Sequence, residues 1–239
     1  MRLLYFEAPA GIAGDMCLAA LVGLGVEPAF IESRLQGLGP IRLRFQPVVK
    51  AGVSALKLEI EAQSPQFDHH HYRDIEKLID QAGLEEAERD LAQAIFKALA
   101  VAEGAIHGVA LEKVHFHEVG AIDSIVDIVG TAIAINALKP DQILFSPIAL
   151  GYGEVAISHG RYPVPALATL ELLKGLPVYG GNHPVELTTP TGAAIAKTLA
   201  QGFSPGMPLM SLEKIGYGAG TRDLKDQPNV LRVSLGLSR

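Results

Sequence analysis

Strand-like and helix-like apolar patterns alternate along the chain, and this alternation limits the folds that it can adopt. Residues 2–7 form an apolar run typical of a buried strand, and residues 16–24 follow with a helical pattern. Residues 41–49 and 54–62 alternate apolar and polar side chains around a glycine, which predicts a hairpin. Because strands and helices are mixed throughout, we predict an α/β (mixed α+β) fold with helices around a mixed sheet.

The remaining patterns place further helices and strands by their periodicity. Helical spacing dominates the middle of the chain, which predicts a central helical segment at about 72–138 that could form a subdomain. A polar break at 63–71 is the best candidate boundary, but we predict one domain over 1–239. The further predicted elements are helices at 28–37, 75–82, 84–99, 121–138, 166–174 and 191–200, and strands at 113–117, 208–215 and 229–235.

Composition excludes several classes of protein. The chain has 239 residues, one cysteine and a formal net charge of −6. One cysteine excludes an intrachain disulfide and a metal site built from several cysteines, and the negative charge argues against a nucleic acid partner. The longest apolar run, within 125–138, is too short to span a bilayer, and no signal-peptide pattern is present. We therefore expect a cytoplasmic protein without membrane contact.

The segment that begins at His115 is the strongest candidate for a metal site. On a strand, residues two apart share a face, so His115 and His117 would point toward one ion. Glu118 follows at the predicted corner between strand and helix. Imidazole and carboxylate ligands together suit borderline divalent ions such as Zn, Ni, Fe or Mn.

Two aspartates follow on the predicted helix and have two interpretations. Asp123 and Asp127 are one helical turn apart and share a face, so both could face the same ion. However, the run from Ser124 to Asp127 also fits a capping box, with Ser124 or Asp123 as the N-cap. Asp127 is therefore either a site residue or only a cap or polar residue.

A second histidine cluster, His69, His70 and His71, lies in the polar break. Consecutive histidines in a loop offer several metal ligands at little geometric cost. The alternative is a solvated loop that caps the next helix through Asp74. The helical patterns between the two clusters could return the chain to the same place, which favours a metal site.

Two loops could hold an anionic ligand. Gly11 and Gly14 lie between a predicted strand and helix, where helix N–H groups are free to bind a phosphate. Asp15 follows as a possible base or metal-bound group, or simply as a favourable first-turn acid. Thr189 and Thr191 flank a proline at the start of another helix, where Thr189 is a plausible N-cap.

Three other features have simpler interpretations. The run 216–220 is glycine-rich like a dinucleotide loop, but no amphipathic helix follows it, so we reject that interpretation. His159 lies in a predicted turn and is either an acid–base group, a ligand or a surface residue. Cys17 is most simply a core residue.

Several of these motifs together resemble one family, the nickel-insertion proteins of the lactate racemase cofactor pathway. The matches run in order across almost the whole chain, and the long stretch after His115 is the most specific. Ala13 stands where the family usually has serine. The resemblance is carried by residues 10–16, 115–127, 159–166, 188–194 and 216–223.

The resemblance implies an activity. Members of this family insert nickel into a pyridinium mononucleotide with two thiocarboxylate groups, giving an S–C–S nickel pincer nucleotide. The reaction uses CTP and a divalent ion such as Mn²⁺ or Mg²⁺, so the enzyme would be a CTP-dependent nickel cyclometallase, a lyase. Because the substrate supplies both sulfurs, a protein with one cysteine needs only nitrogen and oxygen ligands to deliver Ni²⁺.

The resemblance also assigns residues and partners. CTP binding belongs to a C-terminal domain of the relatives, which we expect as a separate subunit or as a part missing from this chain; a homo-oligomer is also possible. The alternatives are a nickel metallochaperone module and a metal-dependent hydrolase. The implied metal ligands are His69, His70, His71, His115, His117, Glu118 and Asp123; the implied catalytic residues are Asp15 and His159; and the implied substrate-binding residues are Gly11, Gly14, Thr189 and Thr191.

Overall fold

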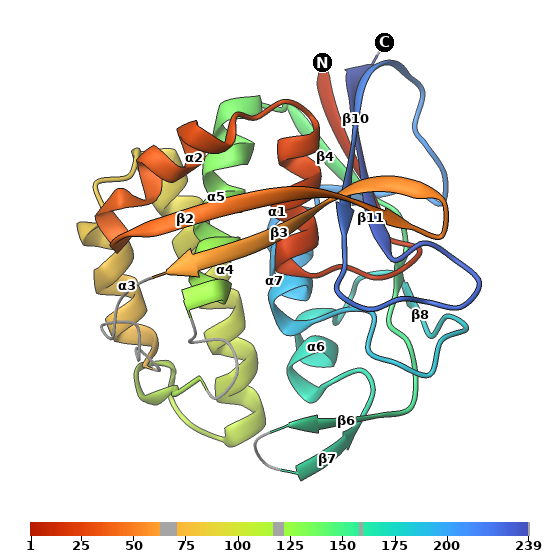
Figure 1. Cartoon of the computed structure of the whole chain (residues 1–239). Helices are drawn as coiled ribbons and strands as arrows, with labels where there is room; N and C mark the ends of the chain where they lie inside the picture. The colour runs from red at the N-terminus through yellow and green to blue at the C-terminus, as the bar shows by residue number, and fades with distance from the viewer. Residues whose placement is uncertain (63–70, 117–121, 158–159, 239) are drawn as a thin grey trace.

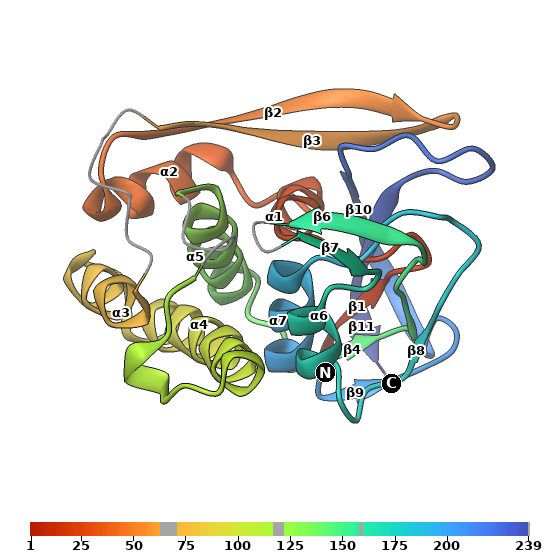
Figure 2. The same ribbon diagram turned by 90° about the horizontal axis from the view of Figure 1, so that it is seen from below.

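Helices gather on one side of a seven-stranded mixed sheet in the computed structural model of the chain (Figures 1 and 2). The structure describes residues 1–62, 71–116, 122–157 and 160–238. The predicted mixed α/β fold is confirmed. Two small sheets, β5-β8 and β6-β7, accompany the large one, whose strand order is β2-β3-β10-β11-β1-β4-β9.

The elements follow the predicted alternation closely. The strands are β1 (Arg2–Glu7), β2 (Ile41–Lys50), β3 (Val53–Ala62), β4 (Gln142–Phe145), β5 (Ile148–Ala149), β6 (Glu154–Ile157), β7 (Gly160–Pro163), β8 (Val178–Tyr179), β9 (Gly202–Phe203), β10 (Met210–Ala219) and β11 (Val230–Ser238). The helices are α1 (Gly14–Gly23), α2 (Pro28–Leu35), η1 (Gln36–Leu38), α3 (Tyr72–Gln81), α4 (Glu86–His107), η3 (Leu111–Lys113), α5 (Ile122–Leu138), α6 (Leu167–Leu172) and α7 (Pro190–Leu199).

The predicted hairpin is confirmed as β2 and β3, which pair antiparallel along their full length. Ala51 and Gly52 both have positive φ, 46° and 83°, which suits the tight two-residue turn between twisted strands. The hairpin joins the rest of the sheet through β3, which runs parallel to β10. This arrangement places the polar face of β3 beside the start of α1.

The glycine-rich run 216–220 has the composition of a loop, but most of it belongs to strand β10. A Cβ on Gly216 would lie 1.9 Å from the carbonyl oxygen of Ala20, and one on Gly218 would lie 1.9 Å from that of Met16. These glycines therefore let α1 lie directly on the strand. The rejection of a dinucleotide loop holds, and the glycines have a packing role.

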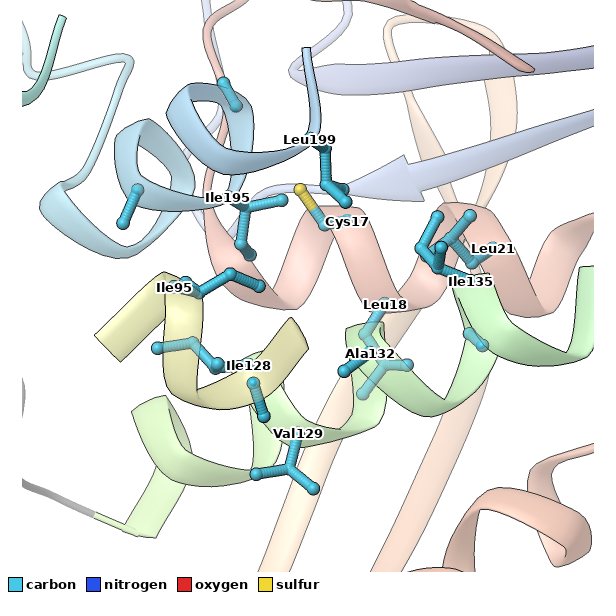
Figure 3. Close-up of a cluster of buried hydrophobic side chains, with 14 of the residues drawn as sticks. Cys17, Leu18, Leu21, Ile95, Ile128, Val129, Ala132, Ile135, Ile195 and Leu199 are labelled. Carbon is cyan, nitrogen blue, oxygen red and sulfur yellow. The ribbon is translucent and has the colours of Figure 1, made fainter. Parts of the chain in front are cut away.

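The core runs between the helices and the sheet. Side chains from α1, α4, α5 and α7 meet in it, as Figure 3 shows for Cys17, Leu18, Ile128 and Ile195. Cys17 is fully buried, and burial raises the pKa of its thiol, so the core interpretation of this residue is confirmed. The same buried cluster includes residues of β1 and of α3, while the division of the chain into domains stays a prediction.

The predicted strand at 113–117 is wrong. Residues 111–113 form η3, and His115 makes only an isolated antiparallel bridge with His71. One pair of residues gives no ladder, so this part of the segment stays irregular between α4 and α5.

Two predicted helix caps are also wrong, because each helix begins before the residue that was expected to cap it. α3 begins at Tyr72, whose ring is buried, so the N-cap is His71 and Asp74 lies inside the first turn. α5 begins at Ile122, which packs against the core, so Asp123 and Ser124 lie inside its first turn. No helix in the described part of the chain is long and apolar enough to cross a membrane.

Candidate active site

The start of α1 places Asp15 at the edge of a pocket. Gly11 turns the chain after β1 with a φ of 80°, and Ala13 is extended before the helix begins at Gly14. Ala13 occupies the N-cap position, where its methyl group cannot accept a hydrogen bond. The second helical residue, Asp15, lies half-buried where the helix meets β3 and the loop after β10.

The Asp15 carboxylate is held on both oxygens. Its Oδ1 accepts a hydrogen bond of 2.8 Å from the Met16 backbone N–H. Its Oδ2 forms an ion pair with the Lys57 ammonium group of β3. The Asp15 side chain is 25% exposed and the Lys57 side chain 19% exposed. Lys57 also donates to Thr221 Oγ1 at 2.8 Å. A half-buried ion pair with these hydrogen bonds fixes the carboxylate in one orientation.

A second helix begins beside α1. Thr189 is the N-cap of α7, as the sequence predicted, and its hydroxyl accepts a hydrogen bond from the Gly192 N–H at 3.2 Å. The Thr189 N–H donates to the Ile12 carbonyl at 3.1 Å. A Cβ on Gly192 would lie 2.1 Å from that same carbonyl oxygen, so the glycine allows the close approach. Two helix N-termini, each a favourable place for negative charge, thus lie side by side.

A pocket of about 200 Å³ opens between these helix starts and the loop after β10. Arg222 belongs to that loop and donates to the Glu186 carbonyl at 3.1 Å. Asn229 holds the loop from within by donating to the Arg222 carbonyl at 2.9 Å. The lining residues that carry polar side chains are Asp15, Glu186, Thr189, Thr221, Arg222 and Asn229.

The predicted substrate-binding residues lie around this pocket, but only Thr189 lines it. Thr191 is buried in the first turn of α7, with its Cγ2 against Gly14. A Cβ on Gly11 would lie 2.1 Å from the Leu187 carbonyl oxygen. The structure thus gives both glycines a packing reason, and their predicted contact with a substrate stays a prediction.

Asp127 of α5 lies behind the start of α1 and is buried. A Cβ on Gly14 would lie 2.5 Å from Asp127 Oδ2, so the carboxyl group sits directly against the helix start. Burial raises the pKa of Asp127 well above its usual range, and the nearby carboxylates of Asp15 and Asp123 raise it further. Lys57 and the Asp15 backbone amide act in the opposite direction.

The structure brings one residue of each histidine cluster together. His71 and His115 form a β-bridge, and their rings meet edge to face with centroids 4.8 Å apart. His71 is exposed and His115 half-buried. The expectation that the intervening helices return the chain to one place is therefore met for these two residues, although their role as metal ligands stays a prediction.

Most of the other predicted metal ligands, and one predicted catalytic residue, lie in parts of the chain that the structure does not describe. His69, His70, His117, Glu118 and His159 lie outside the described residues. Asp123 is exposed in the first turn of α5. Within the described ranges, no group of three or more His, Cys, Asp or Glu side chains is arranged to hold a metal ion.

Sequence reasoning missed the partners of Asp15. Lys57, Thr221 and Arg222 come from a strand and a loop far from Asp15 in the chain. Thr221 and Arg222 fall in the stretch 216–223 that carries the family resemblance, but no site role was predicted for them. Lys57 lies in the predicted strand 54–62, whose side chains alternate between apolar and polar, and a lysine in such a strand is too common to indicate a site.

Comparison with known proteins gives a consistent result. The family model for nickel insertion proteins matches residues 4–239. The chain is 49% identical to the pyridinium-3,5-bisthiocarboxylic acid mononucleotide nickel insertion protein of Geobacillus kaustophilus, over 99% of this chain and 60% of the relative. It is 47% identical to the protein of the same name from Staphylococcus epidermidis, over 97% of this chain and 58% of the relative. It thus spans about 60% of the length of these relatives. No solved structure matches it.

Proposed function

Because the chain belongs to the nickel insertion protein family, we propose that it acts in the insertion of nickel into pyridinium-3,5-bisthiocarboxylic acid mononucleotide. The observation that carries the proposal is the pocket in which Lys57 holds Asp15 beside the N-termini of α1 and α7. We propose this pocket as the site where the mononucleotide binds.

The charges of the pocket support that substrate. A pyridinium mononucleotide joins a cationic ring to a phosphate monoester, so its site needs groups of both signs. Arg222 and the N-terminus of α7 suit the phosphate, because a guanidinium binds phosphate oxygens and the start of a helix favours negative charge. Asp15 and Glu186 provide carboxyl groups for the cationic ring.

The chemistry assigns a proton acceptor. Formation of the carbon–nickel bond replaces a ring C–H bond: Ni²⁺ takes the place of the hydrogen, which leaves as a proton, and the two thiocarboxylate sulfurs complete the pincer. We propose that the Asp15 carboxylate accepts this proton. Its fixed orientation supports that role, since a general base must be held within hydrogen-bonding reach of the proton.

We propose that His71 and His115 bind Ni²⁺ and deliver it to the mononucleotide. Imidazole nitrogen is a good ligand for Ni²⁺, and the contact between His71 and His115 supports a shared ion at that place. Nickel is here a substrate that must be released. Two imidazoles with few further ligands would bind it weakly enough for transfer to the sulfur atoms of the mononucleotide.

The proposal includes CTP dependence, a divalent ion such as Mn²⁺ or Mg²⁺, and a lyase of the cyclometallase type in the cytoplasm. We assign CTP and its cation to the part of the relatives that this chain does not match, present as another domain or subunit. The described residues offer no group of three metal-binding side chains for a resident cation, so no step is assigned to one here.

The proposal is tested by binding of the mononucleotide to the chain, measured by calorimetry. Arg222→Ala should weaken binding by about tenfold or more, because it removes a charge-assisted phosphate contact. Arg89→Ala is the matched control, since Arg89 pairs with Asp90 on α4 away from the pocket. Equal affinities for the two variants would contradict the assignment of the pocket.

Turnover distinguishes the proposed activity from its alternatives. With Ni²⁺, CTP, Mn²⁺ and the C-terminal part of a relative that this chain does not match, mass spectrometry should show a product in which nickel has replaced one proton. Asp15→Asn should slow its formation by about a hundredfold or more. Nickel binding without product under these conditions would instead identify a metallochaperone. Release of phosphate or opening of an amide bond would identify a hydrolase.

A further inference from the structure

The start of α1 leaves backbone amides that need hydrogen-bond partners. The first N–H groups of a helix have no partner within it, and a side chain at the N-cap usually accepts one of them. Here the N-cap is Ala13, which has no acceptor. The Met16 amide donates to the Asp15 carboxylate at 2.8 Å. The amide of Asp15 itself, at the edge of the pocket, has no backbone partner among the described residues.

Asp127 of α5 supplies the missing acceptor. Its carboxyl group lies against this helix start, with Oδ2 beside Gly14 and the Asp15 backbone N–H as the neighbouring donor. Gly14 makes this possible, because any Cβ there would lie 2.5 Å from Asp127 Oδ2 and 2.7 Å from its Cβ. A helix therefore receives its cap from a residue more than a hundred positions later in the chain.

We propose that Asp127 is the N-terminal cap of α1 and a positioning residue for Asp15. Asp15 is then held at three points: its amide by Asp127, its Oδ1 by the Met16 amide, and its Oδ2 by Lys57. Asp127 does not line the pocket and acts only through Asp15. The capping of α1 does not depend on the proposed function. Only the statement that Asp127 holds the proton acceptor Asp15 in place rests on it.

Packing alone does not account for Asp127. The residue is buried in α5 against the start of α1, and its Oδ1 has no hydrogen-bond partner within the described ranges. Burying a carboxyl group in this way costs free energy that an apolar side chain of the same size would not cost. Contact with the α1 amide is what a carboxyl group provides at this position and an apolar group does not.

The test measures hydrogen exchange of the Asp15 amide in the whole chain. An amide at the second position of a helix exchanges quickly unless it has a partner. In the unsubstituted chain we expect protection; in Asp127→Ala we expect it to fall by about tenfold or more, the scale of one hydrogen bond to a buried carboxyl group. Asp127→Asn keeps an acceptor oxygen and should keep most of the protection.

A second substitution separates capping from general packing. Ala13→Ser places a hydroxyl at the N-cap of α1, so the double variant Ala13→Ser, Asp127→Ala should regain protection at Asp15. Thr131→Val is the matched control: Thr131 is also buried in α5 with an unpartnered oxygen among the described residues. It should leave exchange at Asp15 unchanged.

Three results would overturn the proposal: protection kept in Asp127→Ala, no recovery with Ala13→Ser, or equal loss in Thr131→Val. None depends on nickel chemistry, so failure of the proposed function would leave the exchange result standing. Where insertion is observed, Asp127→Ala should lower its rate in the parent chain and add no further loss to Asp15→Ala. An equal further loss in both backgrounds would show that Asp127 does not act through Asp15.

Discussion

At the scale of single residues, the site depends on charged groups that local sequence did not connect. Asp15 was predicted either as a catalytic residue or as a simple first-turn acid, and its orientation comes from Lys57 of β3 and the Met16 amide. Asp127 was left as either a site residue or a cap. It does cap a helix, but that helix is α1 and not its own.

Burial of Asp127 predicts a pH dependence of stability. Its pKa is raised above the usual value near 3.8, so the folded chain binds more protons than the unfolded chain above that pH. Its contribution to the free energy of unfolding is therefore lost as pH rises. Relative to Asp127→Asn, which does not titrate, the unsubstituted chain should lose stability as pH rises above about 4, by at most about 1.4 kcal/mol per pH unit.

Urea unfolding of both chains across that range measures the difference. Asp90→Asn is the control, because Asp90 is exposed on α4 and should give a difference that hardly changes with pH. If the unsubstituted chain kept or gained stability relative to Asp127→Asn as pH rises, the carboxyl group would not be held in its neutral form by burial.

At the scale of elements, close approach of α1 to β10 sets the geometry of the pocket. Gly216 and Gly218 face α1 with no room for a Cβ. The helix start and the loop after β10, which carries Thr221 and Arg222, are thereby held at a fixed distance. The β2-β3 hairpin also contacts this loop, because Lys50 of β2 forms an ion pair of 2.6 Å with Asp223.

Gly218→Ala should therefore separate α1 from β10. We expect a loss in free energy of unfolding of about 1–3 kcal/mol or more, since the new methyl group would overlap the Met16 carbonyl. Gly206→Ala is the matched control, because no atom lies within 4 Å of the added Cβ. Urea unfolding compares the two, and similar losses would contradict a special role of the α1–β10 contact.

At the scale of the whole molecule, the two histidine clusters converge. α3 and α4 return the chain so that His71 and His115 touch. The proposed nickel ligands are thus supplied by segments on either side of a helical hairpin, and the pocket beside α1 is formed by other elements.

The double variant His71→Ala, His115→Ala should weaken Ni²⁺ binding by at least about tenfold, because loss of a direct ligand costs no less than loss of a supporting contact. Calorimetry on the chain gives the affinity. His107→Ala is the control: His107 lies at the end of α4 with its imidazole 3.3 Å from Glu103. Unchanged affinity in the double variant would place the nickel ligands elsewhere.

Local sequence determined much of this protein, because periodicity and turn chemistry act over a few residues. The alternation of patterns gave the mixed fold, Ala51 and Gly52 the hairpin, and Thr189 the cap of α7. The burial of Cys17 followed from its place in an apolar helix. Each of these features depends on side chains that are close together in the chain.

Only the tertiary structure decided the partners of Asp15, the role of Asp127 and the packing of Gly218. Each joins segments far apart in the chain, and no local pattern shows which distant residue will be near. A lysine on a strand face or an aspartate inside a helix is ordinary until the fold places it. The physical reason is that charge pairing, capping between elements and steric fit depend on distance in space, which the folded core sets.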